Sequence, residues 1–206
     1  MLNFNFDQIK DASRLRYYEQ GLRACKGHID YNLLFEISER GKLRMYPWEI
    51  EILYKAVMDR KPRTILEIGS WDGCSTMAMG IACKEFGGHI YSVDPRVGTM
   101  LNDNIKYYGL EKIVTPIKAF SPWVKGIPKR IEFLFIDGDH STRNVLMDYF
   151  YWVHYMKKND IVAFHDIAFD TVRKALDIIM AHDGKHWKEL VKCEERRRGI
   201  GVWRAF

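Results

Sequence analysis

Apolar runs alternate with amphipathic stretches along the chain from about residue 62 onward. Five short runs are mostly apolar and rich in β-branched or aromatic residues, which predicts strands covered on both faces. They are TILEI (64–68), IYSVD (90–94), IVTPI (113–117), FLFID (133–137) and IVAF (161–164). Two further strands, HWKELVKC and IGVWRAF, are joined through the charged ERRRG with no helix between them. The pattern predicts an α/β fold with a doubly wound, mostly parallel, seven-stranded sheet and an antiparallel C-terminal strand pair.

Helical periodicity occupies most of the connections. Helices are expected in WDGCSTMAMGIACKEF, around VGTMLNDNIKYYG, within residues 141–156, and after Asp170, which is a plausible N-cap. In the helix within residues 141–156, the positions expected to face inward are Leu146, Tyr149, Phe150 and Val153. In the helix after Asp170, they are Val172, Ala175, Leu176 and Ile179.

The 60 residues ahead of the first strand also read as helices. The clearest is PWEIEILYKAVMDR, whose apolar face carries Ile52, Leu53, Ala56 and Val57. Residues 1–61 are therefore expected to form a helical segment before a main domain at 62–206. The pattern leaves three roles open for this segment: a cover for the sheet, a lid, or the contact of a homodimer.

Composition adds limits to this outline. The chain has 206 residues, 47% hydrophobic and 29% charged, which is ordinary for one globular domain. No apolar run approaches the roughly 18 residues of a membrane span, and the N-terminus lacks the pattern of a secretory signal. We therefore expect a cytoplasmic protein without a membrane partner, whose four cysteines (Cys25, Cys74, Cys83 and Cys193) are reduced thiols.

The net charge of +5 is mild and does not indicate a nucleic-acid partner. The only dense basic cluster is Arg196-Arg197-Arg198, which precedes the last strand. A solvated turn is the favoured interpretation of this cluster, and contact with phosphates is the alternative.

Polar residues gather where the predicted strands end. In an open α/β sheet, ligands bind at the carboxyl ends of the strands, so these residues should converge. The first strand runs into ILEIGSWDGCST, where Gly69 and Gly73 relieve crowding and a helix N-terminus can face an anionic group. The dinucleotide fingerprint G-x-G-x-x-G is absent, and Glu67 suits a cationic or amine-bearing ligand. Asp94, at the end of the second strand, is a candidate for binding ribose hydroxyls.

The fourth and fifth strands end in groups that bind metals or move protons. FLFIDGDHSTR carries Asp137, Asp139 and His140, and IVAFHD ends in His165 and Asp166. Asp139 is ambiguous, because it can also turn outward and cap the following helix.

Taken together, E-x-G-S-x-x-G-x-S (Glu67, Gly69, Ser70, Gly73, Ser75), Asp94, IDGDH and HD resemble the class I S-adenosylmethionine-dependent methyltransferases. Within that class they are similar to the metal-dependent small-molecule O-methyltransferases, both catechol O-methyltransferase-like and antibiotic-sugar O-methyltransferase-like. The resemblance spans about residues 62 to 205 and implies a Rossmann-like fold and a small hydroxylated acceptor, such as a sugar or a natural-product precursor.

The resemblance also implies roles for individual residues. The turn from Gly69 to Gly73, with Glu67, Ser70 and Ser75, would hold the methionine part of S-adenosyl-L-methionine, and Asp94 its ribose. Phe120 and Ser121 are candidates for the adenine pocket. Asp137, which also borders the cofactor, would bind a divalent metal (Mg or Mn) with His165 and Asp166. His140 matches a proposed general base. The imidazole of His165 shifts the metal preference toward Mn²⁺, Fe²⁺ or Zn²⁺.

Two other functions remain open from the residues. His140 and His165 with Asp137 or Asp166 could form a two-histidine, one-carboxylate iron site for oxygenation. A non-catalytic protein could use the cofactor pocket for sensing or assembly. Methylation of nucleic acid is disfavoured, because Asp137-Gly138-Asp139-His140 occupies the place of an N-P-P-Y-like motif. The acceptor pocket is expected to include the aromatic residues Tyr46, Trp48 and Trp71.

Overall fold

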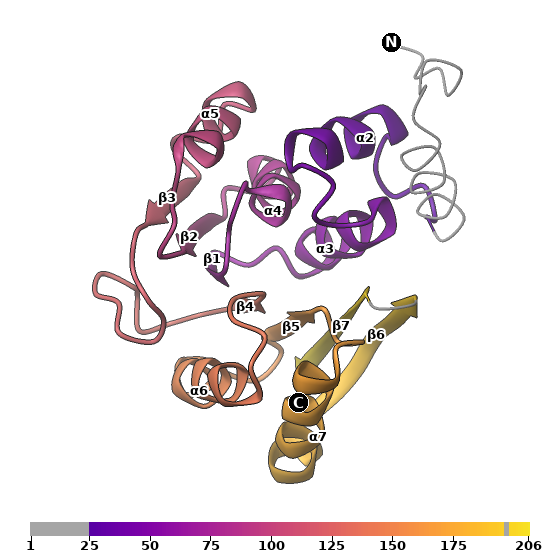
Figure 1. Cartoon of the computed structure of the whole chain (residues 1–206), viewed down its shortest axis with the longest axis vertical. Coiled ribbons are helices and arrows are strands. Elements are labelled where there is room, and N and C mark those ends of the chain that lie inside the picture. The colour runs from indigo at the N-terminus through magenta and orange to yellow at the C-terminus, as the bar shows by residue number, and fades with distance from the viewer. Residues whose placement is uncertain (1–24, 196–197) are drawn as a thin grey trace.

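A seven-stranded sheet forms the centre of the computed structural model, which describes residues 25–195 and 198–206 (Figure 1). The strands are β1 (Thr64–Ile68), β2 (His89–Val93), β3 (Val114–Ile117), β4 (Phe133–Ile136), β5 (Ile161–His165), β6 (Trp187–Glu195) and β7 (Arg198–Ala205). Their order is β3-β2-β1-β4-β5-β7-β6, with β7 antiparallel to both of its neighbours and the other pairs parallel. The predicted doubly wound sheet with an antiparallel C-terminal pair is confirmed. The strand order reverses between β1 and β4, which is where such sheets bind ligands.

Helices cover both faces of this sheet. They are α2 (Tyr31–Arg40), α3 (Pro47–Arg60), α4 (Cys74–Lys84), α5 (Thr99–Tyr107), α6 (Thr142–Trp152) and α7 (Asp170–Asp183), with short 3₁₀ helices at Val153–Tyr155 and Gly184–His186. In Figure 1, α2 to α5 lie on one side of the sheet and α6 and α7 on the other.

The alternation of side chains along each strand builds two separate cores. Ile65, Phe133 and Phe135 pack with residues of α2, α3, α4 and α5. Leu66 and Leu134, one position along, pack on the opposite face with α6 and α7. Successive side chains of a strand point to opposite faces, so an unbroken apolar run supplies both cores.

The N-terminal helices are part of the first of these cores. Trp48, Leu53 and Val57 of α3 are fully or almost fully buried, and they belong to the same cluster as Ile65 of β1. Residues 25–61 therefore cover one face of the sheet. Pro47 opens α3, and Glu49 accepts a hydrogen bond from the N–H of Tyr46 at 2.7 Å, which satisfies a donor at the helix start.

Two details of the predicted helices are wrong. In α6 the buried apolar face consists of Val145, Tyr149 and Trp152, whereas the predicted Leu146, Phe150 and Val153 are only partly buried. The helix ends at Trp152, so Val153 lies in the 3₁₀ turn that follows it. The N-cap of α7 is Phe169 and Asp170 is its first residue, but all four predicted inward positions of α7 are buried.

Residues 1–24, Arg196 and Arg197 lie outside the described residues, so only Arg198 of the basic cluster is placed. Within the described ranges, no helix combines the length and the apolar character needed to cross a bilayer.

Candidate active site

The turn after β1 contains two glycines whose φ angles lie in the left-handed region, which favours glycine. Gly69 has a φ of +89°, and a Cβ there would overlap the carbonyl oxygen of Asp137. Gly73 has a φ of +93° at the start of α4, and its Cβ would lie 2.7 Å from Cδ1 of Leu101. The chain itself, and not only a ligand, therefore demands these glycines. Between them, Trp71 adopts a φ of +45°, a region that bulky residues rarely occupy.

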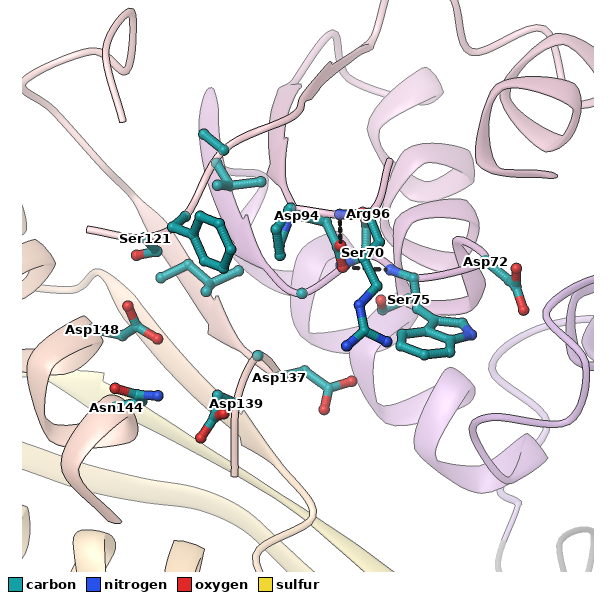
Figure 2. A pocket seen from close by; sticks show the side chains of 18 of the residues that line it. Ser70, Asp72, Ser75, Asp94, Arg96, Ser121, Asp137, Asp139, Asn144 and Asp148 are labelled. Carbon is teal, nitrogen blue, oxygen red and sulfur yellow. Dashed lines mark hydrogen bonds between the residues drawn. The ribbon is translucent and has the colours of Figure 1, made fainter. Parts of the chain in front are cut away.

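Asp94 fixes the same turn from the end of β2. Its Oδ2 accepts hydrogen bonds from the backbone N–H groups of Ser70 at 3.1 Å and Trp71 at 3.0 Å (Figure 2). Its Oδ1 accepts one from the N–H of Arg96 at 2.6 Å. The residue is only 6% exposed. Each carboxylate oxygen has two lone pairs, so Asp94 keeps acceptor capacity toward a ligand.

Glu67 lies beneath the turn. It is fully buried and accepts hydrogen bonds from the hydroxyls of Ser75 at 2.5 Å, Thr76 at 2.6 Å and Ser92 at 2.6 Å. Burial raises the pKa of Glu67 to about 7, although the three hydroxyls oppose the shift. Its carboxylate ties β1 to α4 and β2 and does not line a cavity.

A cavity of about 350 Å³ opens above this turn. Its wall includes the turn from Gly69 to Asp72, the end of β2 at Asp94, the segment Ala119–Ser121 with Trp123, and Asp137 to Asp139. Phe120 and Trp123 stand 69% and 75% exposed at its rim. Asp148 of α6 also faces it (Figure 2), and burial raises the pKa of that carboxyl to about 6. We call this space the first cavity.

A second cavity of about 350 Å³ adjoins the first. Arg44, Trp71, Asp137 and Gly138 border both spaces. The other residues that line the second cavity are His140, His165, Asp166, Phe169 and Arg198.

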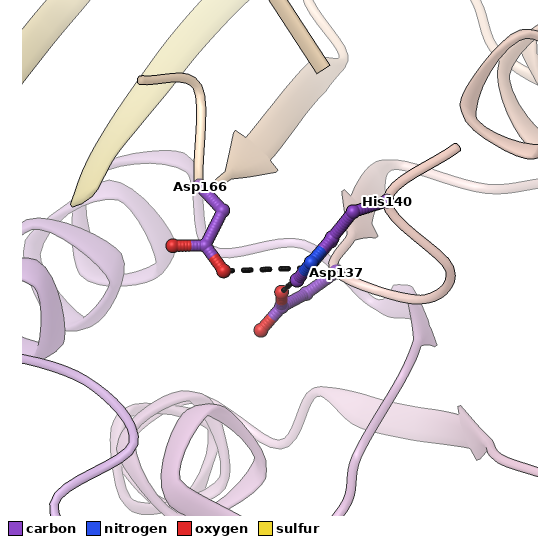
Figure 3. Close-up of side chains that lie close together, drawn as sticks. All are labelled: Asp137, His140 and Asp166. Atoms are coloured by element: carbon purple, nitrogen blue, oxygen red, sulfur yellow. Dashed lines mark ion pairs between the residues drawn. The ribbon is translucent and has the colours of Figure 1, made fainter. Parts of the chain in front are cut away.

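Asp137, His140 and Asp166 form a compact cluster in the second cavity (Figure 3). Nε2 of His140 lies 3.5 Å from Oδ1 of Asp137 and 3.3 Å from Oδ2 of Asp166. The imidazole stacks on the ring of Phe169, with centroids 5.3 Å apart. Contact with the Asp137 carboxylate raises the pKa of His140 above its usual value, against the opposing effect of partial burial. Asp166 has a φ of +51°, an uncommon conformation that aims its carboxylate at the histidine.

His165 has different neighbours from those predicted. Its Nδ1 lies 3.1 Å from Oδ1 of Asp137 and 3.5 Å from Oδ2 of Asp166, but its Nε2 forms an ion pair with Oε1 of Glu49 at 3.1 Å. Burial opposes protonation, yet the charges of Asp137 and Glu49 raise the pKa of His165 well above its usual value. The described residues whose potential ligand atoms lie close together are Asp137, His140 and Asp166, and the metal set of Asp137, His165 and Asp166 stays a prediction.

Comparison with known proteins identifies the fold and the family. The family described as a methyltransferase domain matches residues 66–167. Residues 66–167 are a methyltransferase domain, and the fold is that of the class I, S-adenosylmethionine-dependent enzymes. No curated protein sequence matches it significantly.

Solved structures of similar fold support the assignment. An O-methyltransferase from Bacillus cereus in complex with SAH is 14% identical at a TM-score of 0.70, covering 92% of this chain and 98% of that one. The SAH-bound methyltransferase PaMTH1 from Podospora anserina is 19% identical at 0.68, covering 100% and 98%. The O-methyltransferase TomG from Streptomyces achromogenes, involved in tomaymycin synthesis and in complex with SAM, is 12% identical at 0.67, covering 92% and 97%.

The first cavity of this methyltransferase has features that suit S-adenosylmethionine. Asp94 presents a buried carboxylate to the cavity, and Oγ of Ser70 is a buried polar atom with no hydrogen-bond partner among the described residues. Both are groups that a ligand with hydroxyls and an amino acid end would satisfy. The volume falls in the range of small-molecule sites.

Most of the predicted cofactor residues line the first cavity of the methyltransferase. Those that do are Gly69, Ser70, Ser75, Asp94, Phe120, Ser121 and Asp137. Glu67 and Gly73 do not: the first is buried under the turn and the second starts α4. The hydroxyl of Ser75 donates to Glu67, and that of Ser121 accepts from Nε1 of Trp152 at 2.9 Å. Asp139 is exposed and accepts a hydrogen bond from the N–H of Ser141 at 2.7 Å, while Ser141 is the N-cap of α6.

Sequence reasoning about the methyltransferase missed Arg44, Glu49 and Asp148. Glu49 sits in an amphipathic helix whose pattern indicates only packing. A buried acid on α6 was detectable in principle, because Asp148 and Tyr149 fall on one helical face with Val145.

Proposed function

We propose that this methyltransferase transfers the methyl group of S-adenosylmethionine to a hydroxyl oxygen of a small acceptor, of the size of a sugar or a natural-product precursor. The observation that carries the proposal is the shared wall of the two cavities. A cofactor in the first cavity and an acceptor in the second would meet at Asp137 and Trp71, which border both. Several solved structures of the same fold are described as O-methyltransferases.

Orientation is the main contribution that the chain would make. S-adenosylmethionine supplies a methyl group on a sulfonium with a good leaving group. Holding the reacting atoms in line contributes on the order of 7–11 kcal/mol. The glycine turn and Asp94 would fix one partner, and the aromatic rings of Trp71 and Phe169 would flank the other.

His140 is the residue placed to remove the acceptor proton. Its Nε2 faces the second cavity between two carboxylates, which would stabilise the imidazolium formed when the hydroxyl proton arrives. Phe169 holds the ring plane. Because the pKa of His140 is raised, the free base accumulates only above the usual imidazole range, so the rate should rise with pH there.

Asp137, His140 and Asp166 also suit a divalent cation. Nε2 of His140 is buried and has no hydrogen-bond partner within the described part of the chain, and two carboxylates and one imidazole form a donor set for Mn²⁺ or Mg²⁺. A bound cation would lower the pKa of the acceptor hydroxyl and fix its position. The nitrogen of His140 that faces the cluster serves either as ligand or as base, and the metal dependence of turnover separates these roles. The cluster holds one imidazole, which disfavours the two-histidine iron site.

The test begins with calorimetric titration of the protein with S-adenosylhomocysteine in EDTA, in Mg²⁺ and in Mn²⁺. Binding is expected in all three, because Asp137 is the one member of the cluster that borders the first cavity, and its other lining residues lie outside the cluster. Hydroxylated acceptors are then screened for methyl transfer with wild type, His140→Ala and the control His186→Ala, which alters an exposed histidine away from both cavities. His140→Ala should lower kcat by about 10²–10⁴ while S-adenosylhomocysteine still binds. Absence of binding under every metal condition would end the proposal.

A further inference from the structure

Two arginines, Arg44 and Arg198, line the second cavity together with the Asp137–His140–Asp166 cluster. Arg44 lies between α2 and α3, and Arg198 is the first residue of β7. Nη1 of Arg198 donates a hydrogen bond to the carbonyl oxygen of Arg44, which ties the two segments together. Two guanidinium groups from distant parts of the chain are thereby brought to one cavity.

Both guanidinium groups lie against aromatic rings. That of Arg44 is 5.0 Å from the ring centroid of Trp71, and that of Arg198 is 5.0 Å from the ring of Tyr46. Such contacts position a guanidinium at modest energetic cost and leave in-plane N–H donors available. A guanidinium presents these donors as a fork that matches the two oxygens of a carboxylate or phosphate.

The acidic groups of the cavity are directed elsewhere. Asp137 and Asp166 face His140 and His165, and Glu49 faces His165. Among the side chains that the structure describes, which do not include that of Glu195, no carboxylate lies within ion-pair distance of either arginine. The carboxylates that line the cavity thus contact imidazoles, whereas its two guanidinium groups lie against aromatic rings.

We propose that the methyl acceptor carries an anionic group, a carboxylate or a phosphate, that is bound by Arg44 and Arg198. This inference rests on the proposed function and names the class of acceptor. An anionic group held by the arginines would orient the acceptor, because the carboxylates of Asp137 and Asp166 beside His140 would repel that group. The hydroxyl to be methylated would then be the part that lies toward His140. A cavity of about 350 Å³ admits a single ring or sugar bearing one such group.

The experiment compares matched probes on protein saturated with S-adenosylhomocysteine. The dissociation constants of 3,4-dihydroxybenzoate and its neutral analogue 3,4-dihydroxybenzamide are measured by calorimetry, and inorganic phosphate is titrated separately and as a competitor. At least one anion is expected to bind, with the carboxylate favoured over its amide by about tenfold or more if a bidentate pair forms. Tighter binding of phosphate than of the benzoate would assign the anionic group to a phosphate.

Variants link any preference to the two side chains. Arg44→Gln and Arg198→Gln should each remove most of the preference for the anion, and Arg198→Lys should restore only part of it, because lysine keeps the charge without the fork. Arg204→Gln, an exposed position on the same strand, is the control and should keep the preference.

Three results would overturn the inference while leaving the proposed function intact. They are equal binding of the acid and the amide, a preference that survives both glutamine variants, and no binding of any anionic probe to the S-adenosylhomocysteine complex. Failure to form that complex at all would instead count against the proposed function, so it is measured first.

Discussion

Replacing Asp94 by alanine tests the cofactor site most directly. The carboxylate is almost fully buried and accepts three backbone hydrogen bonds at 2.6–3.1 Å, so solvent does little to screen what it contributes. A hydrogen bond to a charged group is worth about 1.5–3 kcal/mol. Loss of the contact with one ribose hydroxyl should therefore weaken binding of S-adenosylhomocysteine by about 10- to 150-fold.

The same change should also loosen the turn. Alanine leaves the N–H groups of Ser70 and Trp71 without their acceptor, at a cost of about 1–3 kcal/mol of unfolding free energy. Asp94→Asn retains one acceptor oxygen and should destabilise the protein less. The two effects are separated by measuring urea unfolding without ligand and calorimetric affinity on the folded variant. Asp103→Ala, at an exposed position of α5, is the control for loss of a negative charge.

An affinity of folded Asp94→Ala for S-adenosylhomocysteine within about twofold of the wild-type value would refute the ribose assignment. The free energy of a hydrogen bond to a charged group is larger than such a change. Reduced stability with unchanged affinity would show that Asp94 only holds the turn.

Two further predictions concern the residues beneath the turn. Gly69→Ala should lower the thermal unfolding temperature and the affinity for S-adenosylhomocysteine much more than Gly87→Ala does. Both glycines have a positive φ, but of the two only Gly69 would place a Cβ against backbone atoms. Equal effects of the two substitutions would contradict the steric argument. The folded pKa of Glu67 is raised from 4.5 to about 7, so its contribution to stability is fully present below pH 4.5 and is lost as pH rises through 7. As pH rises between these values, the unfolding free energy of the wild type should fall by at most about 1.4 kcal/mol per pH unit relative to that of Glu67→Gln. Urea unfolding of both proteins at pH 5 and pH 7.5 measures this difference. The same change in unfolding free energy in both proteins would disprove the prediction.

Much of the fold was predictable because strands buried on both faces leave a simple apolar signature. FLFI and IVAF are apolar at every position because their alternate side chains supply the two cores on opposite faces of the sheet. The positions of Asp94 and Asp137 followed from the rule that parallel strands end at one edge of the sheet. The inward face of α6 was misread because two stripes sharing Tyr149 compete in the sequence, and the length of the helix decides between them.

The rest of the site depended on contacts that no local pattern encodes. Glu49 contacts His165 only because α3 packs on the sheet face beside β5. The charge of Glu49 helps to raise the pKa of His165. Arg44 and Arg198 meet across more than 150 positions of sequence. Burial and long-range charge pairing are properties of the tertiary structure, so sequence spacing could not supply them.

Because β7 is the last element of the chain, its place in the sequence sets the order in which the two cavities are completed during synthesis. Every residue that lines the first cavity lies between Arg44 and Asp148, whereas the second also needs the end of β5 and Arg198. N-terminal parts of a chain emerge from the ribosome first. A nascent chain thus contains every residue of the first cavity while the edge of β5 still lacks its partner strand. An unpaired strand edge is a template for aggregation, so the strand that completes the second cavity also covers an edge that would otherwise be exposed.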